Sequence, residues 1–202
     1  MRIFIVYCHP ADDSMTGQIR DCFIQGLESR GHCYTLSDLY KMNFRTDMSE
    51  AEYQREAYYR CELPVPSDVL HEQEKINACD GIAFIYPLFW SEAPAKLVGW
   101  FDRVWTYGFA YGENRTMKQL EKALFLVSAG NTNEYFETTG IGNAMKKIML
   151  TDRIGDRAKE TEMIIFGATS REKKERITNR EAHLQRAFNA GAAIGQGGIR
   201  RV

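Results

Sequence analysis

The sequence lacks the features that mark disulfide-bonded, zinc-binding and membrane-spanning proteins. Its five cysteines are odd in number and form no Cys-x-x-Cys pair, so we expect neither a disulfide framework nor a metal site. No apolar stretch approaches the roughly 20 residues of a transmembrane helix, so we expect no membrane insertion. No long basic run occurs and the formal net charge is −1, so nothing indicates a nucleic-acid partner.

Signals for export and for a second domain are also missing. The first seven residues enter a strand-like apolar run at once, without a signal-peptide core or a small-residue cleavage site. We therefore expect a cytoplasmic protein with reduced thiols, with Cys8 and Cys79 in its core. The 202 residues show no repeat, linker or low-complexity segment, so we expect a single domain over residues 1–202.

Short apolar runs alternate with helical patterns along the chain. The apolar runs lie at 3–7, 81–86, 123–127 and 162–166, with a weaker one at 33–39. The helical patterns lie at 16–30, 68–78, 94–105, 140–150 and 171–190, and less clearly at 49–60. Continuous apolar runs suit parallel strands that are covered on both faces. The alternation predicts an α/β fold with an open, doubly wound parallel sheet and helices on both faces, which binds ligands beyond the carboxyl ends of its strands.

The loop after the first strand, at 8–16, has features that are typical of an anion-binding site. It leads from a strand into a helix N-terminus, where unpaired N–H groups and the helix dipole favour a negative charge. His9, Ser14 and Thr16 add polar donors, although the loop is neither Gly-x-x-x-x-Gly-Lys-Ser/Thr nor Gly-x-Gly-x-x-Gly. The alternative is that Ser14 or Thr16 only caps the helix, and Asp12 and Asp13 are unusual beside a phosphate.

The loop at 86–94 presents Phe89 and Trp90 between two prolines. Large apolar side chains are costly to leave in water, so a planar aromatic ligand would explain them. The alternative is that both rings pack as ordinary core beneath the next helix.

The segment at 95–112 continues with more aromatic residues. An apolar stripe at helical spacing consists of Leu97, Trp100, Phe101 and Val104. Trp105, Tyr107, Phe109 and Tyr111 then alternate through a glycine-containing loop, which forms either the wall of a pocket or a contact between subunits.

Together these motifs resemble those of a known family. The matching stretches are 87–90, Pro94, 99–104 and 108–112, joined by His9-Pro10 with Ser14 and Thr16 after it. They closely resemble the flavodoxin-like NAD(P)H:quinone oxidoreductases, the group of DT-diaphorase and modulator of drug activity B. The resemblance covers roughly residues 2–30 and 80–135. It implies a three-layer flavodoxin-like fold with non-covalently bound FAD or FMN, and NAD(P)H as co-substrate.

The resemblance also implies roles for single residues. Those expected to hold the phosphate and ribityl chain are His9, Ser14, Met15 and Thr16. Those expected to contact the isoalloxazine are Pro87, Leu88, Phe89 and Trp90, with Ser128, Ala129, Gly130 and Asn131 under its polar edge. Tyr135 resembles a catalytic tyrosine near the flavin. Phe109 and Tyr111 are expected to bind substrate, with Tyr111 facing the cavity of the partner subunit in a homodimer.

One departure concerns catalysis. Some members carry a histidine six residues beyond the tyrosine, and Ile141 stands at that position here. The resemblance implies ping-pong hydride transfer from NAD(P)H through the flavin to a quinone-like acceptor, and the missing histidine leaves open which group stabilises charge on the flavin. Two alternatives remain, a flavin-binding regulatory subunit of a potassium-efflux-type transporter and a flavodoxin-like electron carrier.

Overall fold

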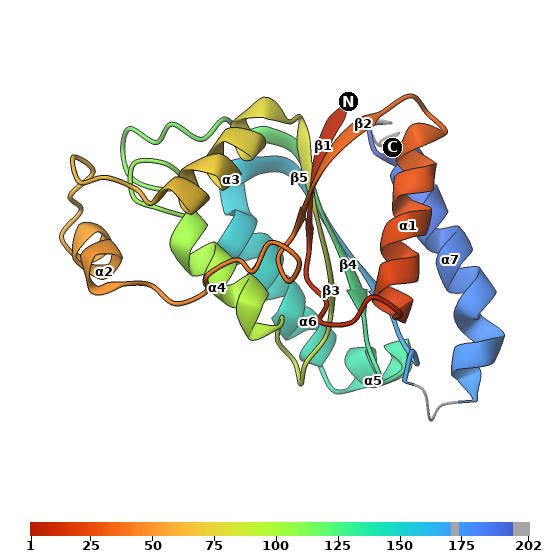
Figure 1. Cartoon of the computed structure of the whole chain (residues 1–202). Helices are drawn as coiled ribbons and strands as arrows, with labels where there is room; N and C mark the ends of the chain where they lie inside the picture. The colour runs from red at the N-terminus through yellow and green to blue at the C-terminus, as the bar shows by residue number, and fades with distance from the viewer. Residues whose placement is uncertain (171–173, 196–202) are drawn as a thin grey trace, which may run out of the picture.

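A parallel sheet forms the centre of the molecule (Figure 1), and the computed structural model describes residues 1–170 and 174–195. The strands are β1 (Arg2–Tyr7), β2 (Cys33–Asp38), β3 (Gly81–Pro87), β4 (Leu120–Ser128) and β5 (Ala158–Phe166). They lie in the order β2-β1-β3-β4-β5, and all neighbours pair in parallel. This is the strand order of flavodoxin-like folds. The predicted fold class is confirmed.

Helices cover both faces of the sheet, as predicted. The helices are α1 (Met15–Glu28), α2 (Glu50–Ala57), α3 (Ser67–Ala78), α4 (Ala95–Val104), α5 (Asn133–Thr138), α6 (Ile141–Lys146) and α7 (Glu175–Ala193). Figure 1 shows α1 and α7 on one face, with α3, α4 and α6 on the other and α2 standing apart from the sheet. A hydrophobic core lies on each face of the sheet, and alternate residues of β1 point into one or the other. Phe4 and Val6 pack on the α3–α4 side, and Ile3 and Ile5 pack on the α1–α7 side.

The two helices on the α1–α7 face touch through a pair of glycines. A Cβ on Gly26 would lie 2.1 Å from the carbonyl oxygen of Phe188, and a Cβ on Gly191 would lie 2.1 Å from that of Phe23. Only glycine allows the two backbones to come this close. The contact holds α1 against α7 on this face of the sheet.

Two regions differ from the sequence prediction. The helix predicted at 140–150 is divided into α6 and a π-helix, Lys147–Ile154, and α5 was not predicted because six residues are too few to show a helical period. The predicted helix at 171–190 corresponds to α7, while its first residues, 171–173, lie outside the described residues.

The cysteines Cys8 and Cys79 lie in the core, as predicted. Burial raises the pKa of Cys8 to about 12 and that of Cys79 to about 11, so both are held as thiols at neutral pH. Within the described part of the chain, no helix is both long enough and apolar enough to cross a membrane.

Candidate functional site

Loops from four strand ends meet in one pocket at the carboxyl edge of the sheet, which we call the strand-end cleft. The lining residues are His9, Ala11, Asp13, Ser14, Met15, Thr16, Pro87, Leu88, Ser128, Gly130, Thr169 and Ser170. Residues from three separate segments predicted to hold the flavin therefore come together here, and the place is where an open α/β sheet binds its ligands.

The start of α1 supplies hydrogen-bond donors to this cleft. Ser14 is the N-cap residue, and its Oγ accepts the N–H of Gly17 over 3.0 Å. The first N–H groups of a helix have no carbonyl partner within it, and here they belong to Met15 and Thr16, which both line the cleft. Ser14 is thus a cap, as the alternative proposed, and also a wall of the cleft, so the two interpretations are compatible.

Two buried hydroxyls join opposite sides of the cleft. Thr16 Oγ1 lies 2.7 Å from Ser128 Oγ, and both side chains are almost fully buried. The hydrogen bond ties the first turn of α1 to the end of β4. It fixes the distance between two segments that were both predicted to contact the flavin.

The loop after β1 holds His9 against its own backbone. His9 Nδ1 lies 3.0 Å from the N–H nitrogen of Ala11 and 2.9 Å from the Ala11 carbonyl oxygen. Burial lowers the pKa of His9, which favours the neutral ring at pH 7. The tautomer that accepts at Nδ1 carries its proton on Nε2, so it offers a ligand a hydrogen-bond donor without a charge.

Acidic residues of the same loop are placed differently from one another. Asp12 forms an exposed ion pair with Lys41 over 3.1 Å, whereas Asp13 lines the cleft. The ion pair offsets one of the two negative charges near the start of α1.

The turn after β3 leaves both of its aromatic side chains exposed. Phe89 and Glu92 exchange two backbone hydrogen bonds of 3.0 and 3.1 Å, so Trp90 and Ser91 occupy the tip of the turn. Trp90 is 98% exposed with a φ of 57°, and Phe89 is 46% exposed. A positive φ disfavours any residue but glycine, and strained backbone of this kind clusters at functional sites. The alternative that both rings pack as core is therefore wrong.

The loop after β4 is held by the loop after β5. The N–H of Ala129 donates to Phe166 O over 2.9 Å, the Ala129 carbonyl accepts the N–H of Thr169 over 2.9 Å, and Asn131 O accepts the N–H of Ala168 over 2.7 Å. Ala129 is buried, so its N–H is used within the protein and is not offered to a ligand. Of the four residues predicted at 128–131, only Ser128 and Gly130 line the cleft.

The residues predicted for catalysis and substrate binding lie outside this cleft in a single chain. Tyr135 is 40% exposed on α5, beside Phe136. Phe109 is buried in the core on the α3–α4 side, and the hydroxyl of Tyr111 donates to Glu56 Oε2 over 2.9 Å. Ile141 starts α6 and is half buried against the core. The roles of Tyr135, Phe109 and Tyr111 stay predictions.

Sequence reasoning missed the residues that follow β5. Thr169 and Ser170 line the cleft, and Thr169 Oγ1 donates to Ala129 O over 2.9 Å. The signal that could have found them was the apolar run at 162–166, because the loop after any parallel strand opens on the same edge of the sheet.

The cleft fits the flavin that the resemblance implies. One end carries hydroxyls and the free N–H groups at the start of α1, which suit a phosphate. The other end, at Pro87 and Leu88, leads directly into the exposed rings of Phe89 and Trp90, which suit a planar ring system. A buried hydroxyl, that of Tyr7, lacks a partner within the described residues and lies beneath the phosphate-binding end.

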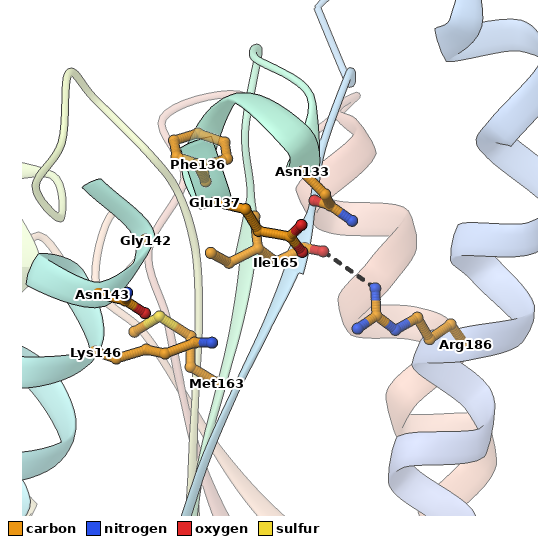
Figure 2. Close-up of a pocket in the computed structure, with 9 residues that line it drawn as sticks. All are labelled: Asn133, Phe136, Glu137, Gly142, Asn143, Lys146, Met163, Ile165 and Arg186. Carbon is orange, nitrogen blue, oxygen red and sulfur yellow. Dashed lines mark hydrogen bonds between the residues drawn. The ribbon is translucent and has the colours of Figure 1, made fainter. Parts of the chain in front are cut away.

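A second pocket lies at the outer edge of β5 (Figure 2). Its lining residues are Asn133, Phe136, Glu137, Gly142, Asn143, Lys146, Met163, Ile165 and Arg186. Arg186 Nη1 donates to the carbonyl of Ile165 over 3.1 Å, so it satisfies an edge-strand group that would otherwise be open to pairing. None of the residues predicted to hold the flavin lines this pocket, whereas eight of the twelve line the strand-end cleft and Phe89, Trp90, Ala129 and Asn131 do not.

Comparison with known proteins places the chain in a family. The flavodoxin-like fold family matches residues 1–187. The solved structure of an NAD(P)H:quinone oxidoreductase from Methanothermobacter marburgensis is 44% identical, with a TM-score of 0.90 and 96% of each chain covered.

Two relatives without such full coverage are also similar. Ribosyldihydronicotinamide dehydrogenase (quinone) of Rattus norvegicus is 33% identical over 69% of this chain and 68% of its own length. A ribosyldihydronicotinamide dehydrogenase-like protein of Penicillium crustosum is 30% identical over 74% of this chain and 65% of its own length. The chain thus spans about two thirds of these two relatives. By its fold, its motifs and these similarities, the chain belongs to the flavodoxin-like NAD(P)H:quinone oxidoreductase family.

Proposed function

We propose that this protein is a flavin-dependent NAD(P)H oxidoreductase that reduces a quinone or a similar acceptor. The observation that carries the proposal is the strand-end cleft, in which donors at the start of α1 lie together with Pro87 and Leu88, the residues that precede the exposed turn at Trp90. Membership of the family supports the same reaction class, and the relative that is 44% identical bears the name of that activity.

The residues of the cleft would bind and orient the cofactor. Ser14, Met15 and Thr16 would hold its phosphate, and the segment from Pro87 to Trp90 would contact its ring. A bound flavin supplies the redox chemistry, accepting hydride from NAD(P)H and passing it to the acceptor in a ping-pong cycle. FMN and FAD share the ring, the ribityl chain and the first phosphate, so the cleft suits either. Holding the cofactor and its reactants close together in the cleft would account for much of the expected rate.

We further propose that two chains form a homodimer through the aromatic surface beside α2. Tyr53, Tyr58 and Tyr59 are each at least 60% exposed, and Tyr59 lies with its ring centroid 4.9 Å from that of Tyr107. Exposed tyrosines are enriched at protein interfaces. A dimer built here would bring the loop containing Tyr111 to the partner. Sedimentation at micromolar concentration tests this, and a monomer that still reduces quinones would contradict it.

The reaction itself is tested on the purified holoenzyme. We expect a yellow protein whose flavin absorbance near 450 nm bleaches anaerobically with NADH or NADPH. Addition of a quinone should then restore the absorbance. Acid release of the flavin and chromatography identify it as FMN or FAD. A flavoprotein that neither nicotinamide bleaches is not this enzyme, and accumulation of a stable one-electron form would indicate an electron carrier instead.

A further inference from the structure

Tyr7, the last residue of β1, carries a buried hydroxyl that has no hydrogen-bond partner among the described residues. The residue is 2% exposed, and its Oη is the one buried side-chain polar atom without a hydrogen bond in the part of the chain that the structure describes. Buried hydroxyls without a protein partner are rare because desolvation is costly, so each one calls for an explanation. Burial raises the pKa of Tyr7, so the group remains a hydroxyl and keeps a proton to donate.

The hydroxyl lies under the first turn of α1. A Cβ built on Gly17 would be 3.3 Å from Tyr7 Oη and also 3.3 Å from Ser14 Oγ. The missing side chain of Gly17 thus leaves the space in which the two hydroxyls approach each other. The guanidinium of Arg20 lies 4.5 Å above the tyrosine ring and holds it in place from the helix side. Second to the effect of burial, a hydrogen-bonding interaction with the Ser14 hydroxyl lowers the pKa of Tyr7, so the two hydroxyls already lie close together, although their geometry falls short of a full hydrogen bond.

Ser14 has room for one more donor. A serine hydroxyl has two acceptor lone pairs and one proton, and Ser14 Oγ already accepts the N–H of Gly17. We propose that Tyr7 is a positioning residue for the cofactor phosphate, whose O–H donates to the second lone pair of Ser14 Oγ when the cleft is loaded. With both lone pairs of its Oγ occupied, Ser14 can form one further hydrogen bond, in which it donates its own proton into the cleft toward an anionic oxygen.

This role rests on the proposed flavin site and concerns only the phosphate. Riboflavin has the ring and the ribityl chain of FMN but lacks the phosphate, so it offers Ser14 no anion. The contribution of Tyr7 should therefore appear for FMN and vanish for riboflavin.

The test compares wild type with Tyr7→Phe, stripped of flavin and titrated with FMN and with riboflavin by fluorescence quenching. We expect the Kd for FMN to rise about 3- to 10-fold and the Kd for riboflavin to stay unchanged. Removing an unpaired hydroxyl should leave the Tm of the apoprotein unchanged or raise it by about 2 °C. Tyr34→Phe, which changes an exposed tyrosine on β2, is the matched control and should leave both Kd values unchanged.

A double-mutant cycle tests the route through Ser14. In a Ser14→Ala background, Tyr7→Phe should no longer weaken FMN binding, because the residue that it positions is gone. If Tyr7→Phe still weakened FMN binding in the Ser14→Ala background, Tyr7 would not act through Ser14. Equal losses of affinity for FMN and riboflavin, or no loss for either, would also contradict the proposal. A wild-type protein that binds neither flavin would instead refute the proposed function itself, so the two failures are distinguishable.

Discussion

Two neighbouring segments of the chain, the turn at 89–92 and helix α4, are both rich in aromatic residues and use them in opposite ways. Trp90 is 98% exposed on a strained backbone, whereas Trp100 is fully buried. The difference follows from position: the turn lies directly beyond the end of β3, while α4 lies against the face of the sheet. The number of aromatic residues in a segment therefore does not indicate whether it forms core or site. The position of the segment relative to the strand ends does.

The buried segment is held by both packing and polar contacts. The ring of Trp100 lies edge-on to that of Phe84, with centroids 5.7 Å apart. Its Nε1–H donates to the buried Glu72 carboxylate over 2.8 Å. Substitution at Trp100 therefore removes a large apolar contact and also takes one partner from a buried carboxylate.

The first prediction sets the two tryptophans against each other. Trp100→Ala should lower the free energy of unfolding by about 4 kcal/mol, which is typical for truncation of a buried aromatic residue. Trp90→Ala should change it by less than about 0.5 kcal/mol, because the side chain contacts mainly solvent. Urea denaturation of both apoproteins measures the two values. Comparable losses from the two substitutions would contradict the division of this segment into core and site.

The second prediction concerns the charged side of α4. Arg103 is buried, and its Nε donates to Glu52 over 2.7 Å while its Nη2 donates to Asp68 over 3.0 Å. Arg103→Met should cost about 3 kcal/mol, because it takes the guanidinium from the buried Glu52 carboxylate and leaves it only Ser49 and Arg45 as partners. Arg115→Met, which breaks an exposed pair with Asp156, is the matched control and should cost less than about 1 kcal/mol. Thermal unfolding compares the two, and equal losses would show that the buried pairing adds nothing.

The same cluster gives stability a pH dependence. Burial raises the pKa of Glu52, but hydrogen bonds from Ser49 and Arg103 outweigh it and leave the pKa below its usual range. The Arg103 guanidinium likewise lowers the pKa of Asp68. Carboxyls with depressed pKa values stabilise the fold above about pH 4 and lose that contribution as the pH falls through their folded-state values. Wild type should lose stability in that acid range more steeply than Arg103→Met.

Most of the fold could be predicted from the sequence because its signals are local. The apolar runs became β1, β3, β4 and β5, and the stripe through Leu97 and Trp100 became the buried face of α4. The division of the segment at 140–150 into α6 and a π-helix left no such signal, since the apolar residues suit either form.

Part of the candidate site could be predicted from the sequence, because the loops that follow the apolar runs can be located from local signals. Ser14 and Leu88 lie in loops that follow strands, so these loops were expected to meet. Two other features depend on contacts between segments that are distant in the sequence. They are the hydrogen bond from the Ala129 N–H to Phe166 and the unpaired hydroxyl of Tyr7. Neither can be inferred from the residue types, because a tyrosine in an apolar strand looks like any other core residue.

A further small effect on stability is predicted at Trp90, and it has the opposite sign. Trp90→Gly places the one residue that tolerates a φ of 57° at the tip of the turn. We expect the free energy of unfolding to rise by about 0.5 kcal/mol, because relief of the strained backbone exceeds the extra entropy of glycine in the unfolded chain.

The same substitution should impair the enzyme while stabilising the apoprotein. Loss of the exposed ring should raise the Kd for FMN and for riboflavin alike, by about 10-fold, because stacking on the ring does not involve the phosphate. Ser91→Gly, at the next position of the same turn, controls for added flexibility without removing an aromatic ring. If Trp90→Gly left both affinities unchanged, the exposed turn would have no part in holding the flavin. If instead it destabilised the apoprotein, the positive φ would carry no strain, and the contrast with Trp100 would rest on burial alone.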